Sequence, residues 1–342
     1  MLQQLCEFRE KLDSLMCRCI NRRITLYGFG YTGRFIKWYA KYYHNIDIAY
    51  CITEDMQTGI SYDAEIYHDY FFKYNYKDFK DTLIWLAVPY DERVHKLIAD
   101  EAGKHEVIDF YKAIYGNDYL WEINGSEDIY HKRKEGLRDI QFMEYLEWKY
   151  DCNFISMVDN SMLTYAGKFG SSYRATTQKE LFPILDACHC KPKEDDALFD
   201  FGCGKGSVLI GALDYGFEKV GGVEYEPGLY EVMVENRRKL SINENRMSCY
   251  CEDAANISLE LDDYNWFYFW DPFGKEVLRK VAENIIDSTI RNPRRVHIVY
   301  SNPKYCEVFG RDEIRLVSQF TIETRQKVVA VFENIKYQVE CK

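Results

Sequence analysis

One short segment, residues 197–206, restricts the possible fold more than any other part of the chain. It reads ALFDFGCGKG, an apolar run that contains Asp200 and leads into three glycines at alternate positions. A short apolar run bounded by turn residues predicts a buried strand. Glycines let the backbone turn sharply and let a ligand approach the main-chain N–H groups. The next residues, SVLIGALDYG, predict a helix whose N-terminus faces the same loop. We therefore expect an α/β unit that binds a ligand beside this glycine loop.

The acidic residue before the loop limits the kind of ligand. A phosphate would suit a helix N-terminus, but Asp200 ends the strand beside it. A carboxylate at that position suits a cationic or hydroxyl-rich ligand better than a polyphosphate. No Gly-Lys-Ser/Thr closes a longer loop here, so the phosphate-binding loop of nucleotide hydrolases does not fit.

Further strand-like segments follow at regular intervals. Residues 220–224 (VGGVE) end in an acid that could accept both ribose hydroxyls of an adenosine. That spacing also fits an NAD-binding fold. The later markers are CEDAA at residues 251–255, WFYFWDPF at 266–273, a strand at 296–300 followed by Ser-Asn-Pro, and two strands at 315–321 and 327–334.

This order of markers resembles the class I S-adenosylmethionine-dependent methyltransferases, over about half of the chain from Tyr173 onward. The resemblance implies a seven-stranded sheet with a terminal antiparallel hairpin, and S-adenosyl-L-methionine as cofactor. It also implies an adenine contact at Asp253 and approach of Tyr173 and Thr176 to the methionine end. The implied cofactor-binding residues are Tyr173, Thr176, Asp200, Gly202, Gly204, Gly206, Glu224, Asp253 and Ala254.

The end of the fourth strand is where this family presents the methyl group. Asp271 is therefore the candidate base, Tyr300 and Asn302 are candidate orienting groups, and Phe273 would cover the cofactor or stack on the acceptor. The sequence D-P-F lacks one proline of the N/D-P-P-Y/F tetrapeptide found in enzymes that methylate amino groups of bases or glutamine, which weakens the case for those acceptors.

Each candidate also has a structural alternative. Asp271 could only begin the turn at Pro272, and Phe273 could be core. Tyr300 and Asn302 could be turn residues before a proline. Asp253 could cap a helix that begins at Ala254.

The N-terminal half carries a second glycine turn. Gly28, Gly30 and Gly33 follow a strand at residues 24–27 and open a helix, and Glu54 ends the next apolar segment. This is the dinucleotide-binding pattern. It resembles the small Rossmann-like domains of sugar-modifying and cell-surface-glycan enzymes, which often carry I-x-x-Y-G-x-G-x-x-G. Strands at 82–88 and 106–110 and a helix at 91–102 complete the expected unit. Nucleotide binding and a scaffold or docking role both remain open.

We accordingly expect two Rossmann-like domains. The first spans residues 1–115 with a helical start at 1–20, residues 116–165 form a helical connector, and residues 166–342 form the methyltransferase domain. The N-terminus carries charges where a signal peptide needs an apolar run, and no stretch is long enough to span a membrane. Twelve cysteines without an export signal predict reduced thiols in the cytoplasm. Their C-x-C pairs do not match zinc spacing, so no metal is expected.

The leading hypothesis is methyl transfer to a small-molecule or glycan-type acceptor such as a sugar or sugar nucleotide. The net charge of −11 argues against nucleic acid as acceptor. The alternatives are an oxidoreductase that uses NAD or a nucleotide sugar at the first glycine turn, a methyltransferase of protein or nucleic acid, and a non-enzymatic binding module.

Overall fold

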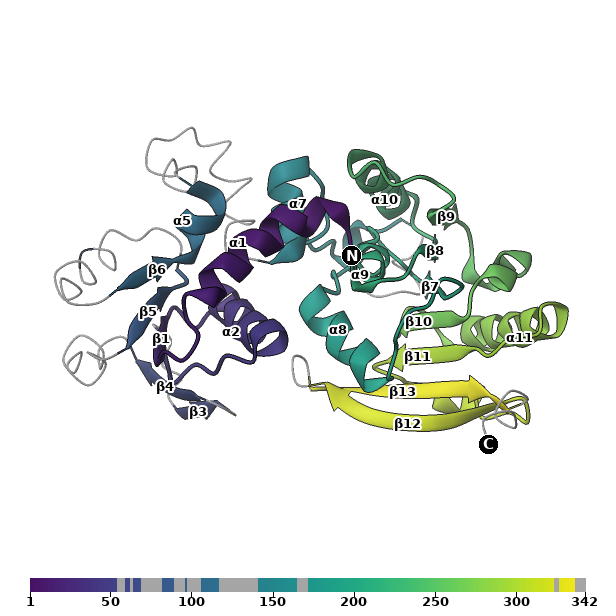
Figure 1. Cartoon of the computed structure of the whole chain (residues 1–342). Helices are drawn as coiled ribbons and strands as arrows, with labels where there is room; N and C mark the ends of the chain where they lie inside the picture. The colour runs from purple at the N-terminus through teal and green to yellow at the C-terminus, as the bar shows by residue number, and fades with distance from the viewer. Residues whose placement is uncertain are drawn as a thin grey trace. The chain divides into compact units, whose positions relative to one another are not determined.

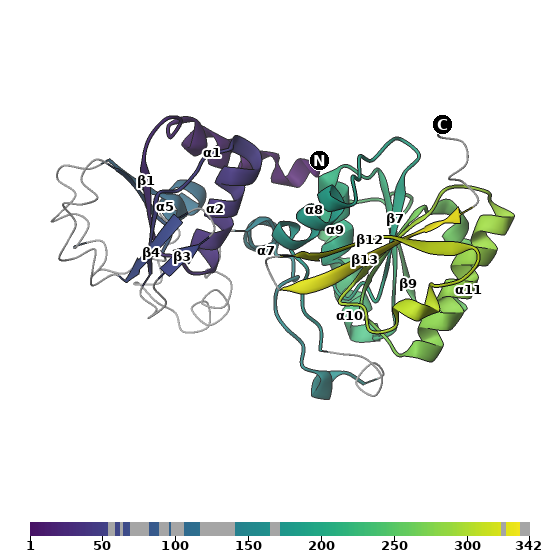
Figure 2. The same ribbon diagram turned by 90° about the horizontal axis from the view of Figure 1, so that it is seen from below.

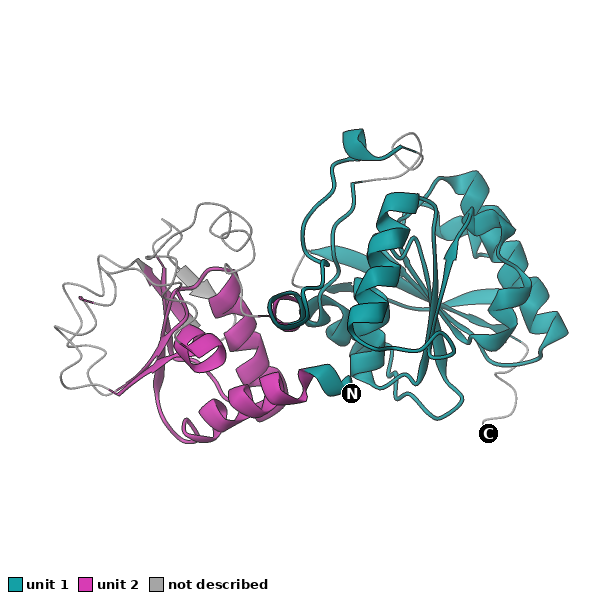
Figure 3. Cartoon of the chain, turned by 90° about the horizontal axis from the view of Figure 1, so that it is seen from above, with its two compact units in different colours: residues 1–4, 146–342 teal, residues 5–145 magenta. Residues whose placement is uncertain are grey.

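The computed structural model describes residues 1–53, 59–61, 64–68, 82–88, 96, 106–116, 141–164, 172–322 and 326–335. The chain divides into two compact units (Figure 3). One comprises Leu5–Tyr145, and the other comprises Met1–Gln4 together with Leu146–Lys342. Within the described residues, no helix is both long and apolar enough to cross a membrane.

The N-terminal unit contains a six-stranded sheet in the order β3-β4-β2-β1-β5-β6. Adjacent strands are parallel except for the antiparallel pair β3 and β4. Its strands are β1 (Ile24–Tyr27), β2 (Tyr50–Thr53), β3 (Gly59–Ser61), β4 (Ala64–His68), β5 (Leu83–Leu86) and β6 (Val107–Asp109). Its helices are α1 (Cys6–Cys17), α2 (Tyr31–His44) and α5 (Phe110–Tyr115). The sequence predicted neither β3 nor β4, and the helix expected at 91–102 lies outside the described residues, as does Glu54.

The first glycine turn joins β1 to α2, and the packing of the chain itself explains two of its glycines. Gly28 has φ +97°, and a Cβ there would lie 2.8 Å from the Ala87 carbonyl oxygen. A Cβ on Gly33 would overlap the carbonyl oxygen of Gly28. Gly30 has nothing within 4 Å of its Cβ position. The contact with the segment after β5 thus requires Gly28, and the close approach of α2 to the turn requires Gly33, whether or not a nucleotide binds. Nucleotide binding stays a prediction.

The C-terminal unit contains a seven-stranded sheet in the order β12-β13-β11-β10-β7-β8-β9 (Figure 1). Its strands are β7 (Ala197–Phe201), β8 (Lys219–Glu224), β9 (Met247–Cys251), β10 (Trp266–Trp270), β11 (His297–Ser301), β12 (Ile314–Ile322) and β13 (Lys327–Asn334). Its helices are α8 (Gln178–Ala187), α9 (Ser207–Tyr215), α10 (Pro227–Lys239) and α11 (Lys275–Arg291). In Figure 2, α8, α9 and α10 lie on one side of this sheet and α11 lies on the other.

Shorter helices complete the chain. Helix α7 (Phe142–Tyr150) contributes residues to both units, so it belongs wholly to neither. The 3-10 turns are η1 (Gln3–Leu5), η4 (Asn160–Met162), η6 (Ala254–Asn256), η7 (Leu259–Asp263) and η8 (Cys306–Val308).

The last strand enters the sheet between two earlier ones. Strand β13 pairs antiparallel with both β11 and β12, whereas the pairs from β11 through β9 are parallel. A core of apolar side chains lies between this sheet and α11, including Phe199, Phe267, Ile298 and Phe332. The α/β fold with two Rossmann-like sheets and a terminal antiparallel hairpin is therefore confirmed.

A buried carboxylate near the end of β13 should make this unit sensitive to acid. Glu333 accepts hydrogen bonds from Arg295 at 2.8 Å and from His297 Nδ1 at 2.9 Å. Burial raises the pKa of the Glu333 carboxyl, but the bonds from His297 and Arg295 outweigh it and hold that pKa at about 2. A lowered carboxyl pKa stabilises the fold above the usual value of 4.5, and this contribution is lost as the pH falls from 4.5 toward 2.

We expect acidification through this window to remove about 3 kcal/mol of unfolding free energy that depends on Glu333. Urea unfolding followed by circular dichroism, at neutral pH and at several acidic values, measures the slope. Glu333→Gln should flatten the slope, with Glu313→Gln as the control. An unchanged slope in Glu333→Gln would assign the acid sensitivity to other groups.

Candidate active site

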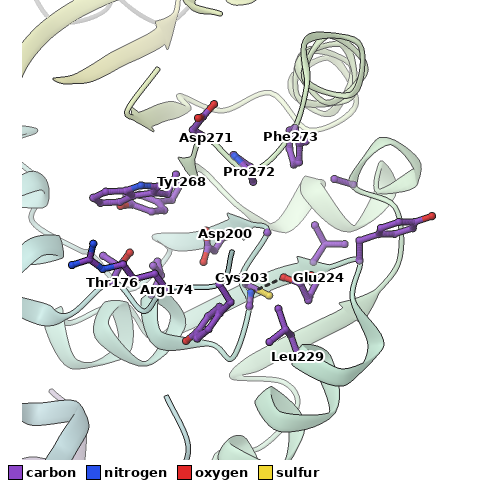
Figure 4. A pocket seen from close by; sticks show the side chains of 18 of the residues that line it. Arg174, Thr176, Asp200, Cys203, Glu224, Leu229, Tyr268, Asp271, Pro272 and Phe273 are labelled. Atoms are coloured by element: carbon purple, nitrogen blue, oxygen red, sulfur yellow. Dashed lines mark hydrogen bonds between the residues drawn. The ribbon is translucent and has the colours of Figure 1, made fainter. Parts of the chain in front are cut away.

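The carboxyl ends of the parallel strands open on a cavity of about 680 Å³ (Figure 4). It lies entirely within the C-terminal unit. Most of the residues assigned to the site from the sequence line it. They are Tyr173, Thr176, Asp200, Gly202, Gly204, Glu224, Asp253, Ala254, Asp271, Phe273 and Asn302.

The glycine loop turns between β7 and α9 with left-handed backbone at each glycine. The φ angles of Gly202, Gly204 and Gly206 are +79°, +54° and +88°. A Cβ on Gly202 would lie 2.7 Å from Cβ of Pro272, and one on Gly204 would overlap the ring of Tyr173. The loop therefore passes between two other segments of the site with no room for side chains at these positions. Gly206 lies at the N-cap of α9 and does not line the cavity.

Glu224 holds the loop in place through its carboxylate. Oε2 accepts the Gly204 N–H at 2.8 Å, and Oε1 accepts the Glu226 N–H at 2.8 Å. Burial raises the pKa of Glu224, while the backbone N–H groups of Glu226 and Gly204 act to lower it. Each oxygen has a further lone pair, so the carboxylate can still accept from a ligand.

Asp200 is the second buried carboxyl group of the cavity. It lies on β7, which pairs in parallel with β8, the strand that ends at Glu224. Its side chain is buried, and no hydrogen bond to it is found from any residue that the structure describes. Burial, and secondarily the charge of Glu224, raise the pKa of Asp200 well above its usual range. A buried carboxylate without partners costs free energy, so the site favours a ligand that brings positive charge or hydrogen-bond donors.

Lys205 anchors the loop from the side away from the cavity, and the sequence reasoning missed this role. Only 2% of the residue is exposed. Its ammonium group donates to Asn153 Oδ1 and to the Ser156 carbonyl, both at 2.8 Å, and lies 5.1 Å from the ring centre of Tyr173. Burial lowers the pKa of Lys205. From the sequence alone, a lysine between two glycines is expected to be exposed to solvent. The groups that bind the ammonium of Lys205 lie some fifty positions upstream, so the local sequence does not indicate its burial.

The acids after β9 are largely occupied by local bonds. Asp253 Oδ1 accepts the Ala255 N–H at 2.9 Å and caps η6, which is the structural alternative considered from the sequence. Glu252 accepts from Asn256 Nδ2 at 2.9 Å and from the Asp253 N–H at 2.8 Å. Both acids nevertheless line the cavity.

Asp271 and Asn302 come together at the ends of β10 and β11. Both have left-handed backbone, with φ +42° and +53°, and Asn302 Nδ2 lies 3.4 Å from Asp271 Oδ2. Lys304, which the sequence reasoning also missed, places its ammonium group 2.5 Å from the same oxygen. The hydrogen bond and charge of Asp271 raise the pKa of Lys304. The Asp271 carboxylate is thus paired with a cation.

The orienting role expected of Tyr300 requires correction. Tyr300 is fully buried and does not line the cavity. Its ring packs edge-on against Phe269 and Phe309, and its hydroxyl accepts the Lys304 N–H at 3.3 Å. Tyr300 is therefore a core residue. Phe273 does line the cavity and also packs against Phe269. Its contact with the cofactor or the acceptor stays a prediction.

No group of three or more histidine, cysteine, aspartate or glutamate side chains is placed to hold a metal ion among the residues described.

The strand order and the position of the glycine loop define the fold of the C-terminal unit. The sheet has five parallel strands with the glycine loop after the central one, and the last strand is inserted antiparallel next to the parallel set. The C-terminal unit has the class I methyltransferase fold, as the motifs predicted. One curated relative, the ribosomal protein L11 methyltransferase of Tolumonas auensis, is 27% identical over 180 residues, which are 49% of this chain and 60% of the relative. The match thus spans less than two thirds of the relative's length. No protein-family model matches.

Solved structures with similar folds include two methyltransferases. The ribosomal protein L11 methylase of Lactobacillus delbrueckii subsp. bulgaricus has a TM-score of 0.35 and 12% identity, over 45% of this chain and 75% of that one. The RNA methyltransferase of Salinibacter ruber, in complex with S-adenosyl-L-homocysteine, has a TM-score of 0.36 and 15% identity. The match covers 48% of this chain and 96% of that one. The resemblance of the N-terminal half to domains of glycan enzymes is not confirmed.

The expected acceptor must be corrected. A small-molecule or glycan-type substrate was expected, with nucleic acid disfavoured by the net charge. The curated relative is named for a ribosomal protein instead. The preference for a sugar or sugar nucleotide is therefore wrong.

Proposed function

We propose that this chain transfers a methyl group from S-adenosyl-L-methionine to a group on a macromolecule, a protein or a nucleic acid. The observation that carries the proposal is the pair of buried carboxyl groups, Asp200 and Glu224, at adjacent strand ends beside the glycine loop. Asp200 has no hydrogen-bond partner within the described residues, so a ligand with a positive charge compensates its burial. The name of the curated relative supports a macromolecular acceptor.

The residues of the cavity fit this cofactor. Glu224 would accept the ribose hydroxyls with the lone pairs that Gly204 and Glu226 leave free. The segment at Asp253 and Ala254 would border the adenine. Asp200, with Thr176 and Tyr173, would border the methionine end. When bound, S-adenosylmethionine supplies an electrophilic methyl carbon on a positively charged sulfur.

The chain's own contribution is to bind, to align and to exclude water. The loop between Tyr173 and Pro272 fixes one wall of the cavity. Phe273 and Trp270 give the acceptor side an apolar surface that displaces water. Asp271 can hold a donor group of the acceptor once Lys304 moves from its carboxylate. An amine acceptor needs less from such a base than a hydroxyl does.

An oxidoreductase that uses NAD at the first glycine turn is the alternative. It has less support, because the packing of the chain itself already requires Gly28, against Ala87, and Gly33, against Gly28. Glu54, its expected ribose ligand, lies outside the described residues. Cytoplasmic location stays a prediction from the cysteine content.

Calorimetry with the full chain tests the proposal. We expect S-adenosylmethionine and S-adenosylhomocysteine to bind with a Kd in the micromolar range, about −8 kcal/mol. NAD serves as the comparison ligand, because both cofactors contain an adenosine. If NAD binds and neither methionine derivative does, the proposal is lost and the oxidoreductase replaces it.

A further inference from the structure

The two ends of the active-site cavity carry opposite charges. The strand ends of β8 and β9 contribute Glu224, Glu252 and Asp253. Three cations line the same cavity from other segments: Arg174, Lys304 and Lys327. In Figure 4, Arg174 lies at the end of the cavity away from Glu224. The end that accommodates the adenosine is thus acidic. The remaining end carries these three cations and the carboxylate of Asp271, which pairs with Lys304, so it holds excess positive charge in a chain whose net charge is −11.

Two of the cations come from segments next to Asn302. Lys304 follows it by two positions and contacts Asp271. The Asn302 N–H donates to the Val328 carbonyl at 2.8 Å, which places Lys327, at the start of β13, beside Asn302. These lysines therefore flank the strand end at which the acceptor would meet the methyl group.

Arg174 and Lys327 have no partners among the described residues. Both are exposed, and neither forms an ion pair or a hydrogen bond with its side chain there. Many other cations of the same unit are paired, including Arg237 with Glu244, Lys239 with Asp151, and Arg291 with Asp262. Among the residues that the structure describes, nothing neutralises these two positive charges at the cavity, and they can be offered to a ligand.

Planar apolar side chains accompany these charges. Trp270, at the end of β10, and Phe273 both line the cavity and are partly exposed. Partly exposed aromatic rings that line a cavity together with cations suit a single-stranded nucleic acid, because bases stack on the rings while phosphates contact the cations. An acidic peptide would match the charge but would leave the rings without planar partners.

We propose that Arg174, Lys304 and Lys327 form a basic rim that binds the phosphates of a single-stranded nucleic acid, whose base enters the cavity as the methyl acceptor. This inference rests on the proposed function and specifies its acceptor. Because RNA and DNA share this chemistry, the experiment includes both.

Fluorescence anisotropy of the full chain, saturated with S-adenosylhomocysteine, tests the rim. The probes are a short fluorescein-labelled single-stranded RNA and the DNA of the same sequence. The variants are Arg174→Gln, Lys327→Gln and the double change. Lys191→Gln is the control, because Lys191 is exposed and precedes the amino end of β7, whereas the cavity lies at the carboxyl ends of the strands.

We expect the double variant to bind the labelled nucleic acid about tenfold more weakly than the parent chain at low salt. The slope of log Kd against log salt concentration should fall by about 0.7 for each cation removed. The Lys191→Gln control should match the parent chain. Binding of either nucleic acid with this pattern supports the rim. Equal binding by parent and double variant overturns it, as does an acidic peptide that binds while neither nucleic acid does. Calorimetry with S-adenosylhomocysteine on the same samples separates these results from failure of the methyltransferase proposal, since cofactor binding does not require the rim.

Discussion

Replacing Glu224 by alanine is expected to weaken binding of S-adenosylmethionine by about a hundredfold or more, close to 3 kcal/mol. Two effects combine in this variant. The carboxylate would no longer accept the ribose hydroxyls, and the N–H groups of Gly204 and Glu226 would lose their acceptors at 2.8 Å. A buried N–H without an acceptor costs about 1–3 kcal/mol. The glycine loop would then lose the contact that fixes its position.

Glutamine at position 224 should restore little of this affinity. Its amide has one acceptor oxygen, whereas the native carboxylate uses both oxygens for backbone N–H groups. The amide NH₂ would face one of those donors. Calorimetry with S-adenosylhomocysteine measures both variants against Glu231→Ala, a change at an exposed glutamate of α10. Should Glu224→Ala bind as tightly as Glu231→Ala, the cofactor site has been misplaced.

The order of strands in the C-terminal unit could be predicted from the sequence because each central strand is a short apolar run between turn residues. Residues 197–201 and 266–270 are buried on both faces of a parallel sheet, and such strands appear as continuous apolar segments. Glycines at alternate positions mark the loop that follows the first of these strands, and their φ angles are positive. Strands β3 and β4 of the N-terminal unit are short and carry no comparable pattern, so they were missed.

The same burial on both faces explains the error at Tyr300. Side chains alternate between the two faces of a strand, but an apolar run does not indicate which face adjoins a site. Tyr300 is directed into the core between Phe269 and Phe309. Asn302 reaches Asp271 only after the backbone changes direction at a left-handed φ of +53°. The residue types at the strand ends therefore predicted where the site lies. They did not predict which of the side chains there face the cavity.

Lys205 and Lys304 were missed because their partners come from other segments. The ammonium group of Lys205 contacts residues 153 and 156, and Lys304 contacts Asp271 on the neighbouring strand. The acceptor prediction was wrong for a related reason. Net charge is a sum over the whole chain and does not report the local sign at a cavity. Three cations at one end of the cavity are compatible with a total of −11.

Gly204→Ala should disable cofactor binding as strongly as the loss of Glu224, by a different physical route. Gly204 has φ +54°, a conformation that costs an alanine about 1 kcal/mol or more. Its new Cβ would also overlap the ring of Tyr173, whose hydroxyl donates to the Phe154 carbonyl at 2.7 Å. The ring is buried and cannot turn aside without breaking that bond. The loop must shift instead, which moves the Gly204 N–H away from Glu224, and we expect about a hundredfold loss of affinity.

Gly228→Ala is the matched control for this change. Gly228 lies in the first turn of α10, and nothing is within 4 Å of its Cβ position. Alanine is favoured over glycine within a helix by about 1 kcal/mol, so this variant should be as stable as the parent or more so and should bind cofactor normally. Both proteins are compared by thermal unfolding and by calorimetry with S-adenosylhomocysteine. If a folded Gly204→Ala protein binds S-adenosylhomocysteine normally, the loop tolerates a side chain facing Tyr173. Cofactor binding would then not depend on the close packing that the glycines allow.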